Sequence, residues 1–289
     1  MIRTVLVHLM GTSGDQAVLT AAQAVARPLA AHLECLHIRP DLERILASEV
    51  ARKKGEDVGA IGEVIESLKT QSAELARRAE DEFAAFCDRE DVLRAESPPS
   101  PGKMNAAFHE LLGGQVERLI EQSRCHDLLI VKGGSVDSGG MHPIELSRLI
   151  MTSGRPILLA SDASPRRFGT VVIAWKDGPE AARAVTAAMP ILEKAERIFV
   201  VTTSEDDGLV SHCESVVRHL AWHGLGAEAH SVDPGERDAA HAVLEMARAA
   251  GADLLVMGAY GHSRLRETVL GGFTHSVLYD ASLPVFMLH

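Results

Sequence analysis

Two pairs of glycines near the C-terminus are spaced so that they could hold a ligand that carries phosphate. Gly258 and Gly261 are separated by two residues, and nine more residues lead to Gly271 and Gly272. Glycine has no Cβ, so its backbone N–H can approach a ligand closely. Where glycines begin a helix, unpaired N–H groups and the positive end of the helix dipole also suit a phosphate. Thr274 could donate its hydroxyl to the same anion or cap the helix.

A strand and a helix must position these glycines. Residues 253–257 read Asp-Leu-Leu-Val-Met, which predicts a buried strand over these residues that is followed by Gly258, and a helix is expected near residues 271–279. Earlier in the chain, residues 127–133 read Asp-Leu-Leu-Ile-Val-Lys-Gly. This similarity predicts an internal repeat.

The repeat covers both halves of the 289-residue chain. Each half begins with a β-branched run and ends with an apolar run: residues 4–8 and 155–160, then residues 170–174 and 283–288. Residues 161–169 are polar and contain Pro and Gly, which is typical of a linker. We therefore predict two domains, residues 1–162 and residues 168–289.

Strands that alternate with helices predict βαβ units and a parallel sheet. The expected class is α/β, with two tandem doubly wound five-stranded parallel sheets, each in the strand order 3-2-1-4-5. Ligands of such sheets bind beyond the carboxyl ends of the strands, where the strand order reverses. The loops after the first and fourth strands of each half are therefore the candidate binding loops.

Gly258, Gly261 and Gly271 match the pattern G-x2-G-x9-G-[ST] of nucleotide-binding universal stress proteins, and the chain resembles this family over most of both halves, in its tandem form. The resemblance implies a fold similar to that of the adenine-nucleotide α-hydrolases. It also implies a stress-response role, with an adenine nucleotide (ATP or AMP) as ligand, with which Mg²⁺ could be bound. The fifth strands of the two halves should face each other as an internal pseudo-dimer, which leaves a further homodimer open.

Two positions depart from the family pattern. Gly272 stands where the family has Ser or Thr, so one phosphate-binding hydroxyl is missing, although Thr274 lies two residues further on. Lys176 stands where ATP-binding members have an Asp that holds adenine, and Asp177 could substitute after a shift of one residue. A lysine cannot accept a hydrogen bond from the adenine amine, but it could contact a phosphate.

The candidate nucleotide-binding residues are Ala174, Lys176, Asp177, Gly258, Gly261, His262, Gly271, Gly272 and Thr274. His262 could contact phosphates or lie free in its loop. No Ser-His-Asp set, carboxylate pair or G-x-S-x-G motif suggests a catalytic site. Three histidines at residues 212, 219 and 223 share a helix face, but they supply only one close pair, which favours a polar face over zinc. We expect no metal ligands and no catalytic residues.

The first half is expected to have lost the site. Met10 stands at the position of the adenine-binding Asp, and the segment after residues 127–133 lacks a second glycine pair before the helix. Its own glycines could still form an anion nest, but a flexible connection is favoured. Residues 40–75 are surplus to the repeat and rich in helix formers, which predicts a helical insertion. A simple decoration is favoured there over a lid or a partner-docking segment.

Composition excludes several classes of function. The net charge of -11 and the aromatic content of 4% argue against binding to nucleic acid. The N-terminal apolar run is too short for a signal peptide or a membrane span. Four cysteines without a CxxC pair indicate reduced thiols. These features predict a soluble cytoplasmic protein with no membrane partner.

Three functions are compatible with the sequence. The favoured one is a nucleotide-binding stress-response module with at most slow ATP hydrolysis. The second is a stress protein that binds no nucleotide and acts through contacts with other proteins. The third, least favoured because no general base stands out, is an enzyme of a related nucleotide-binding fold.

Overall fold

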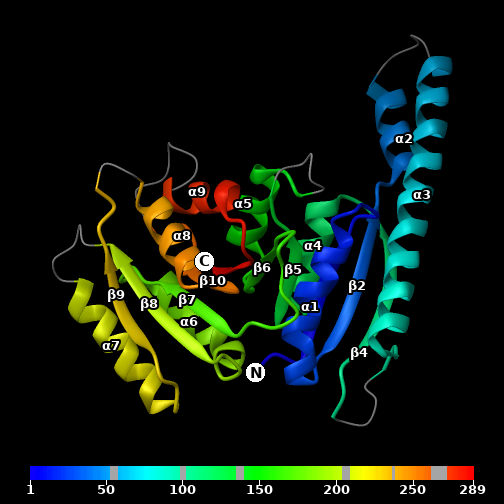
Figure 1. The fold of residues 1–289 in the computed structure, drawn as a ribbon. Helices are drawn as coiled ribbons and strands as arrows, with labels where there is room; N and C mark the ends of the chain where they lie inside the picture. Colours follow the sequence, from blue (N-terminus) through cyan, green and yellow to red (C-terminus); the bar gives the residue numbers. More distant parts are fainter. Residues whose placement is uncertain (53–57, 98–101, 135–139, 204–208, 236–237, 262–271) are drawn as a thin grey trace.

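The structure is a computed structural model that describes residues 1–52, 58–97, 102–134, 140–203, 209–235, 238–261 and 272–289. Within these residues the strands form a single sheet of eleven strands. Helices cover both faces of the sheet, as Figure 1 shows. No described helix is both long and apolar enough to cross a membrane.

Each half supplies alternating strands and helices. The N-terminal half contains β1 (Thr4–Leu9), α1 (Asp15–Leu29), β2 (His32–Arg39), α2 (Leu42–Arg52), α3 (Val58–Glu90), β3 (Leu93–Arg94), β4 (Asn105–Leu112), α4 (Gln115–Ser123), β5 (Leu128–Lys132), α5 (Pro143–Thr152) and β6 (Ile157–Ala160). The C-terminal half contains β7 (Thr170–Ala174), α6 (Pro179–Leu192), β8 (Arg197–Thr203), α7 (Leu209–Trp222), β9 (Glu228–Val232), α8 (Ala239–Ala249), β10 (Leu254–Gly258), α9 (Gly272–Asp280) and β11 (Val285–Leu288).

The strand order 3-2-1-4-5 is confirmed in each half. The sheet runs β3-β4-β2-β1-β5-β6-β11-β10-β7-β8-β9. It differs from the expectation in two ways: β3 adds a short edge strand, and the two five-stranded units are joined into one sheet. The join is the antiparallel pair β6–β11, so the fifth strands do face each other.

The join has the register of a two-fold axis. Leu158 pairs with Phe286, and the flanking pairs are Leu159 with Val285 and Ile157 with Met287. The two central strands therefore contribute corresponding residues to the contact, which is the arrangement of an isologous interface between two copies. Here both copies lie in one chain.

An aspartate anchors the first strand of each half to its fourth strand. Asp127 Oδ2 accepts hydrogen bonds from the backbone N–H groups of Arg3 (2.7 Å) and Thr4 (3.0 Å). Asp253 Oδ2 does the same for Gly169 (2.9 Å) and Thr170 (2.8 Å). The repeated Asp-Leu-Leu sequence is therefore explained by a structural contact that its aspartate makes in each half. This contact lies at the amino ends of the strands, at the opposite edge of the sheet from the carboxyl ends where ligands bind.

Two apolar layers sandwich the sheet. Helices α1, α3, α6 and α7 pack on one face, and α4, α5, α8 and α9 pack on the other. Every residue of β5 and β7 is buried, because helices cover both sides of these central strands. The insertion after β2 forms α2 and most of α3. The last turns of α3 pack on β2 and β4, and the α2–α3 hairpin projects beyond the sheet edge (Figure 1).

Candidate functional site

A cavity of about 410 Å³ lies in the C-terminal half, beyond the carboxyl ends of β7, β8 and β10. This is the point where the strand order reverses, which is where the sequence predicts the ligand. Seven of the nine candidate residues line the cavity: Ala174, Lys176, Asp177, Gly258, Gly261, Gly272 and Thr274. The other two, His262 and Gly271, lie outside the described residues.

Gly258 allows the start of α6 to pack directly on the end of β10. A Cβ at Gly258 would lie 2.5 Å from the backbone N of Ala181 and 2.7 Å from the carbonyl carbon of Glu180. These are backbone atoms that cannot move without shifting the helix. The first glycine of the motif is therefore required for helix–strand packing, whatever it does for a ligand.

Glu180 places its carboxylate beside Gly261. A Cβ at Gly261 would lie 3.1 Å from Glu180 Oε2, and a Cβ at Gly178 would lie 3.5 Å from the same atom. The Glu180 side chain is only 14% exposed and pairs with Arg183 at 3.1 Å. A carboxylate in the first turn of α6 is stabilised by the helix dipole. Glu180 thus supplies a negative charge of its own at the helix end that faces the cavity.

Other charged groups surround the cavity mouth. Lys176 and Asp177 are exposed on the loop after β7, and both line the cavity. Asp238 caps α8 by accepting a hydrogen bond from Ala240 N (3.3 Å), and it also bonds Ser276 on α9. Of the described lining residues, three are therefore acidic and one is basic.

The hydroxyl oxygen of Thr274 accepts a hydrogen bond from the backbone of Tyr260. The distance from Oγ1 to Tyr260 N is 3.3 Å, and Thr274 is 4% exposed. Tyr260 itself adopts a left-handed φ of 57°. Its hydroxyl lies 2.8 Å from Ser147 Oγ on α5, so this side chain links the two halves. Burial raises the pKa of the Tyr260 phenol.

Two polar side-chain atoms at the cavity lack a hydrogen-bond partner among the described residues, and one of them is Thr202 Oγ1 on β8. The other is the buried Nε1 of Trp175, the residue that follows β7. Buried donors are nearly always satisfied, so such an atom is an observation in favour of a polar ligand nearby.

The corresponding turn of the N-terminal half is closed by Asp15. Asp15 is 2% exposed, and its carboxylate accepts hydrogen bonds from the backbone N–H groups of Met10 (2.9 Å) and Gly11 (2.8 Å). Burial raises the pKa of this carboxyl to about 6. A Cβ at Gly11 would lie 2.1 Å from the carbonyl oxygen of Leu75, because α3 passes directly over the turn. The N–H groups that could meet a ligand are already used.

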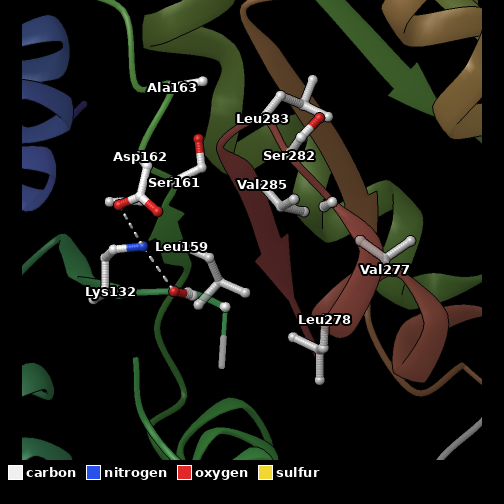
Figure 2. Close-up of a pocket in the computed structure, with 14 residues that line it drawn as sticks. Lys132, Leu159, Ser161, Asp162, Ala163, Val277, Leu278, Ser282, Leu283 and Val285 are labelled. Carbon is white, nitrogen blue, oxygen red and sulfur yellow. Dashed lines mark hydrogen bonds and ion pairs between the residues drawn. The ribbon is translucent and has the colours of Figure 1, made fainter. Parts of the chain in front are cut away.

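Lys132 takes the place of Gly258 in the N-terminal half. Its side chain lies against the start of α1, where a Cβ at Gly14 would be 3.3 Å from Lys132 Cγ. The Lys132 ammonium donates to the carbonyl of Gly133 (3.1 Å) and pairs with Asp162 (3.1 Å), as Figure 2 shows. The Lys132 side chain therefore lies between the strand exit and the start of α1, whereas in the C-terminal half the start of α6 packs directly on Gly258.

Sequence reasoning missed Trp175, Glu180 and Asp238 as lining residues. The fold predicts that the carboxyl ends of neighbouring strands share an edge, and this could have identified Asp238, which follows the third strand. Glu180 could not be found in this way, because its position depends on how closely α6 approaches β10. Among the described residues, no three His, Cys, Asp or Glu side chains are grouped so that they could hold a metal ion.

The fold and the cavity define a doubly wound α/β protein with its open cleft at the switch point of the C-terminal half. Residues 167–289 match the model of the universal stress protein family, and this half of the chain belongs to that family. The N-terminal half repeats its strand order, so the chain has the layout of the tandem form.

Solved structures support the same fold over the whole chain. A universal stress protein from Archaeoglobus fulgidus DSM 4304 matches with a TM-score of 0.70 and 16% identity, over 99% of this chain and 97% of that one. A protein of unknown function from Pseudomonas aeruginosa PAO1 matches with a TM-score of 0.59 and 16% identity, over 99% and 92%. No curated protein matches. At these identities the likeness shows the fold alone.

Proposed function

We propose that the protein is a nucleotide-responsive stress protein whose C-terminal cavity binds an adenine nucleotide. The observation that carries this proposal is that seven of the nine candidate residues line one cavity of about 410 Å³ at the switch point. The motif has glycines on two separate segments, and both segments reach the cavity through Gly258, Gly261 and Gly272.

The residues present fit a nucleotide in part. Among the described residues, no atom lies within 4 Å of where a Cβ at Gly272 would be, so none of them covers the start of α9. Lys176 would meet phosphates, and Asp177 would meet the adenine amine. Glu180 opposes the phosphates, because its carboxylate lies next to Gly261. We therefore expect binding that depends on the number of phosphates. Any Mg²⁺ would be bound together with the nucleotide.

We further propose that only the C-terminal half binds. Asp15 uses the N–H groups of its turn, Lys132 lies between the strand exit and the start of α1, and α3 covers Gly11. Because of these contacts, the described part of the N-terminal turn lacks the accessible backbone groups and the cavity that are present in the C-terminal half.

The test is a titration of a fluorescent ATP analogue against the parent and Gly261→Val. A valine at this exposed position would press on the flexible end of Glu180 and narrow the cavity, so binding should be lost while the fold is kept. Gly226→Val is the matched control, since a Cβ there meets no atom of the described residues within 4 Å. Lys132→Met tests the N-terminal half and should leave binding unchanged. Gly140 is no control, because its Cβ would lie 2.5 Å from the carbonyl oxygen of Gly134.

The alternative function is a stress protein that acts through protein contacts without nucleotide. Two observations favour it: the Glu180 carboxylate next to Gly261 opposes a phosphate, and Lys176 stands where ATP-binding members have the Asp that holds adenine. If neither ATP, AMP nor adenosine binds the parent at millimolar concentration, this alternative replaces the proposal. If Gly261→Val binds as tightly as the parent, the cavity is the wrong site.

A further inference from the structure

A second cavity, of about 270 Å³, lies where the two halves meet. Figure 2 shows Leu159 and Ser161 of the N-terminal half on one side of it and Leu283 and Val285 of the C-terminal half on the other. Val277 from α9 forms part of its wall. This cavity is separate from the candidate nucleotide site, and none of the motif residues line it.

The internal repeat shows which side chains the cavity lacks. Gly133 N donates to the carbonyl of Ala160 (2.8 Å), and Ala259 N donates to the carbonyl of Leu288 (3.0 Å). These equivalent hydrogen bonds align Gly133 with Ala259. The next residues along each strand therefore correspond as well.

At the corresponding place, the C-terminal half has two ring side chains. Tyr260 corresponds to Gly134, and His289 corresponds to Ser161. Tyr260 reaches Ser147 on α5 through its hydroxyl (2.8 Å), and His289 Nδ1 lies 3.1 Å from the carbonyl of Ala259. The N-terminal half has neither ring, so it leaves space where the other half is filled.

The polar group at this place is unsatisfied. Ser161 is 9% exposed, and its hydroxyl oxygen is buried with no hydrogen-bond partner in the described part of the chain. Its counterpart His289 has a partner. A buried hydroxyl without a partner beside an unfilled cavity is accounted for by a bound molecule that carries a polar group.

The volume fits a single substituted ring. At about 30 Å³ per water-sized group, the cavity holds about nine non-hydrogen atoms. The side chain that the other half places there, a phenol on one methylene, has about that size. The walls are aliphatic, which suits an aromatic ring, and Lys132 and Asp162 make the rim polar.

We propose that this cavity binds a small monocyclic aromatic compound with one polar substituent, such as a phenol. The ring lies among the aliphatic side chains of both halves, and its polar substituent hydrogen-bonds the Ser161 hydroxyl. Because the compound contacts both halves at once, it stabilises the β6–β11 join, and the melting temperature rises with its concentration.

The test follows the fluorine NMR signal of para-fluorophenol with the full chain. The parent should broaden the signal saturably, with millimolar affinity, and excess ATP should not displace the probe. Ala281→Leu places a larger side chain at the cavity wall and should abolish the effect. Ser161→Ala removes one hydrogen bond and should weaken the affinity about fivefold. Ser147→Ala, the matched control, breaks the Tyr260 contact of the other half and should leave probe binding unchanged.

Three results would overturn the proposal. The parent could fail to broaden the signal, which would leave the cavity empty or reserved for a side chain of a partner protein. Ala281→Leu and Ser161→Ala could both bind like the parent, which would place the probe elsewhere. Cyclohexanol could bind as tightly as the phenol, which would show an apolar cavity with no preference for an aromatic ring.

Discussion

The charge of Glu180 should determine how many phosphates the C-terminal cavity accepts. Its carboxylate lies 3.1 Å from where a Cβ at Gly261 would be, so a phosphate next to Gly261 would come within about 5 Å of it. At an effective dielectric constant of about 20, two unit charges at that distance repel by about 3 kcal/mol. Solvent and salt at the cavity mouth reduce this to about 1–2 kcal/mol.

Glu180→Gln should therefore tighten ATP binding about 5- to 30-fold, because an amide of the same shape removes the repulsion. AMP should gain less than ATP, and adenosine should not change. Isothermal titration of the three ligands against the parent and the variant measures the effect. Glu193→Gln, at the exposed far end of the same helix, is the matched control.

Two outcomes would refute this reasoning. Equal gains for adenosine and ATP would mean that Glu180 acts through packing rather than charge. An unchanged affinity for ATP would mean that the phosphates lie far from Gly261. Neither result by itself would exclude nucleotide binding, since the parent titration tests that separately.

Three further predictions concern affinity and stability. Gly272→Ser restores the hydroxyl of the family motif, at a position where a Cβ meets no described atom within 4 Å, and should strengthen ATP binding about tenfold, measured by the same titration. Asp253→Ala leaves the N–H groups of Gly169 and Thr170 without their acceptor and should lower the free energy of unfolding by about 2–3 kcal/mol in urea melts. Burial, together with nearby His37, lowers the pKa of His8 to about 3, so its contribution to stability is present above pH 6.5 and is lost as the pH falls toward 3. His8→Leu should remove about 1.4 kcal/mol per pH unit of this dependence, and an unchanged slope in acid melts would contradict it.

The sequence predicts the fold well because its strands are continuous apolar runs between helices. Residues 170–174 are predicted as the first strand of the second half, and β7 has the same bounds. The pattern of apolar residues within a single segment cannot show how strands from different halves pair. The two halves merge into one sheet because β6 and β11 pair, with Leu158 opposite Phe286. This pairing is a tertiary contact, and neither apolar segment by itself identifies the other as its partner.

The candidate site divides in the same way. Glycine spacing and strand order identify Gly258, Gly261 and Gly272, because both depend on sequence distance and topology. The same reasoning predicts that Thr274 either contacts an anion or caps the helix, whereas in the structure its Oγ1 accepts a hydrogen bond from Tyr260 N. Glu180 is missed because its importance comes from the close approach of α6 to β10, which only the packed structure contains.

The two halves use the same sheet edge in opposite ways. At the first-strand turn, Asp15 satisfies the N–H groups of one half, while the other half presents Lys176 and Asp177 on an exposed loop. At the exit of the fourth strand, the Lys132 side chain of one half lies where Gly258 of the other half leaves room for the start of α6.

At the join between the halves, the C-terminal half is the one with the side chain. Tyr260 occupies the space beside its fourth strand, and the corresponding space in the N-terminal half is a cavity. Each half thus retains one cavity where the other has a side chain. Ligands at these two places would differ in chemistry, since one cavity has acidic groups and glycines around it and the other is walled mainly by aliphatic side chains.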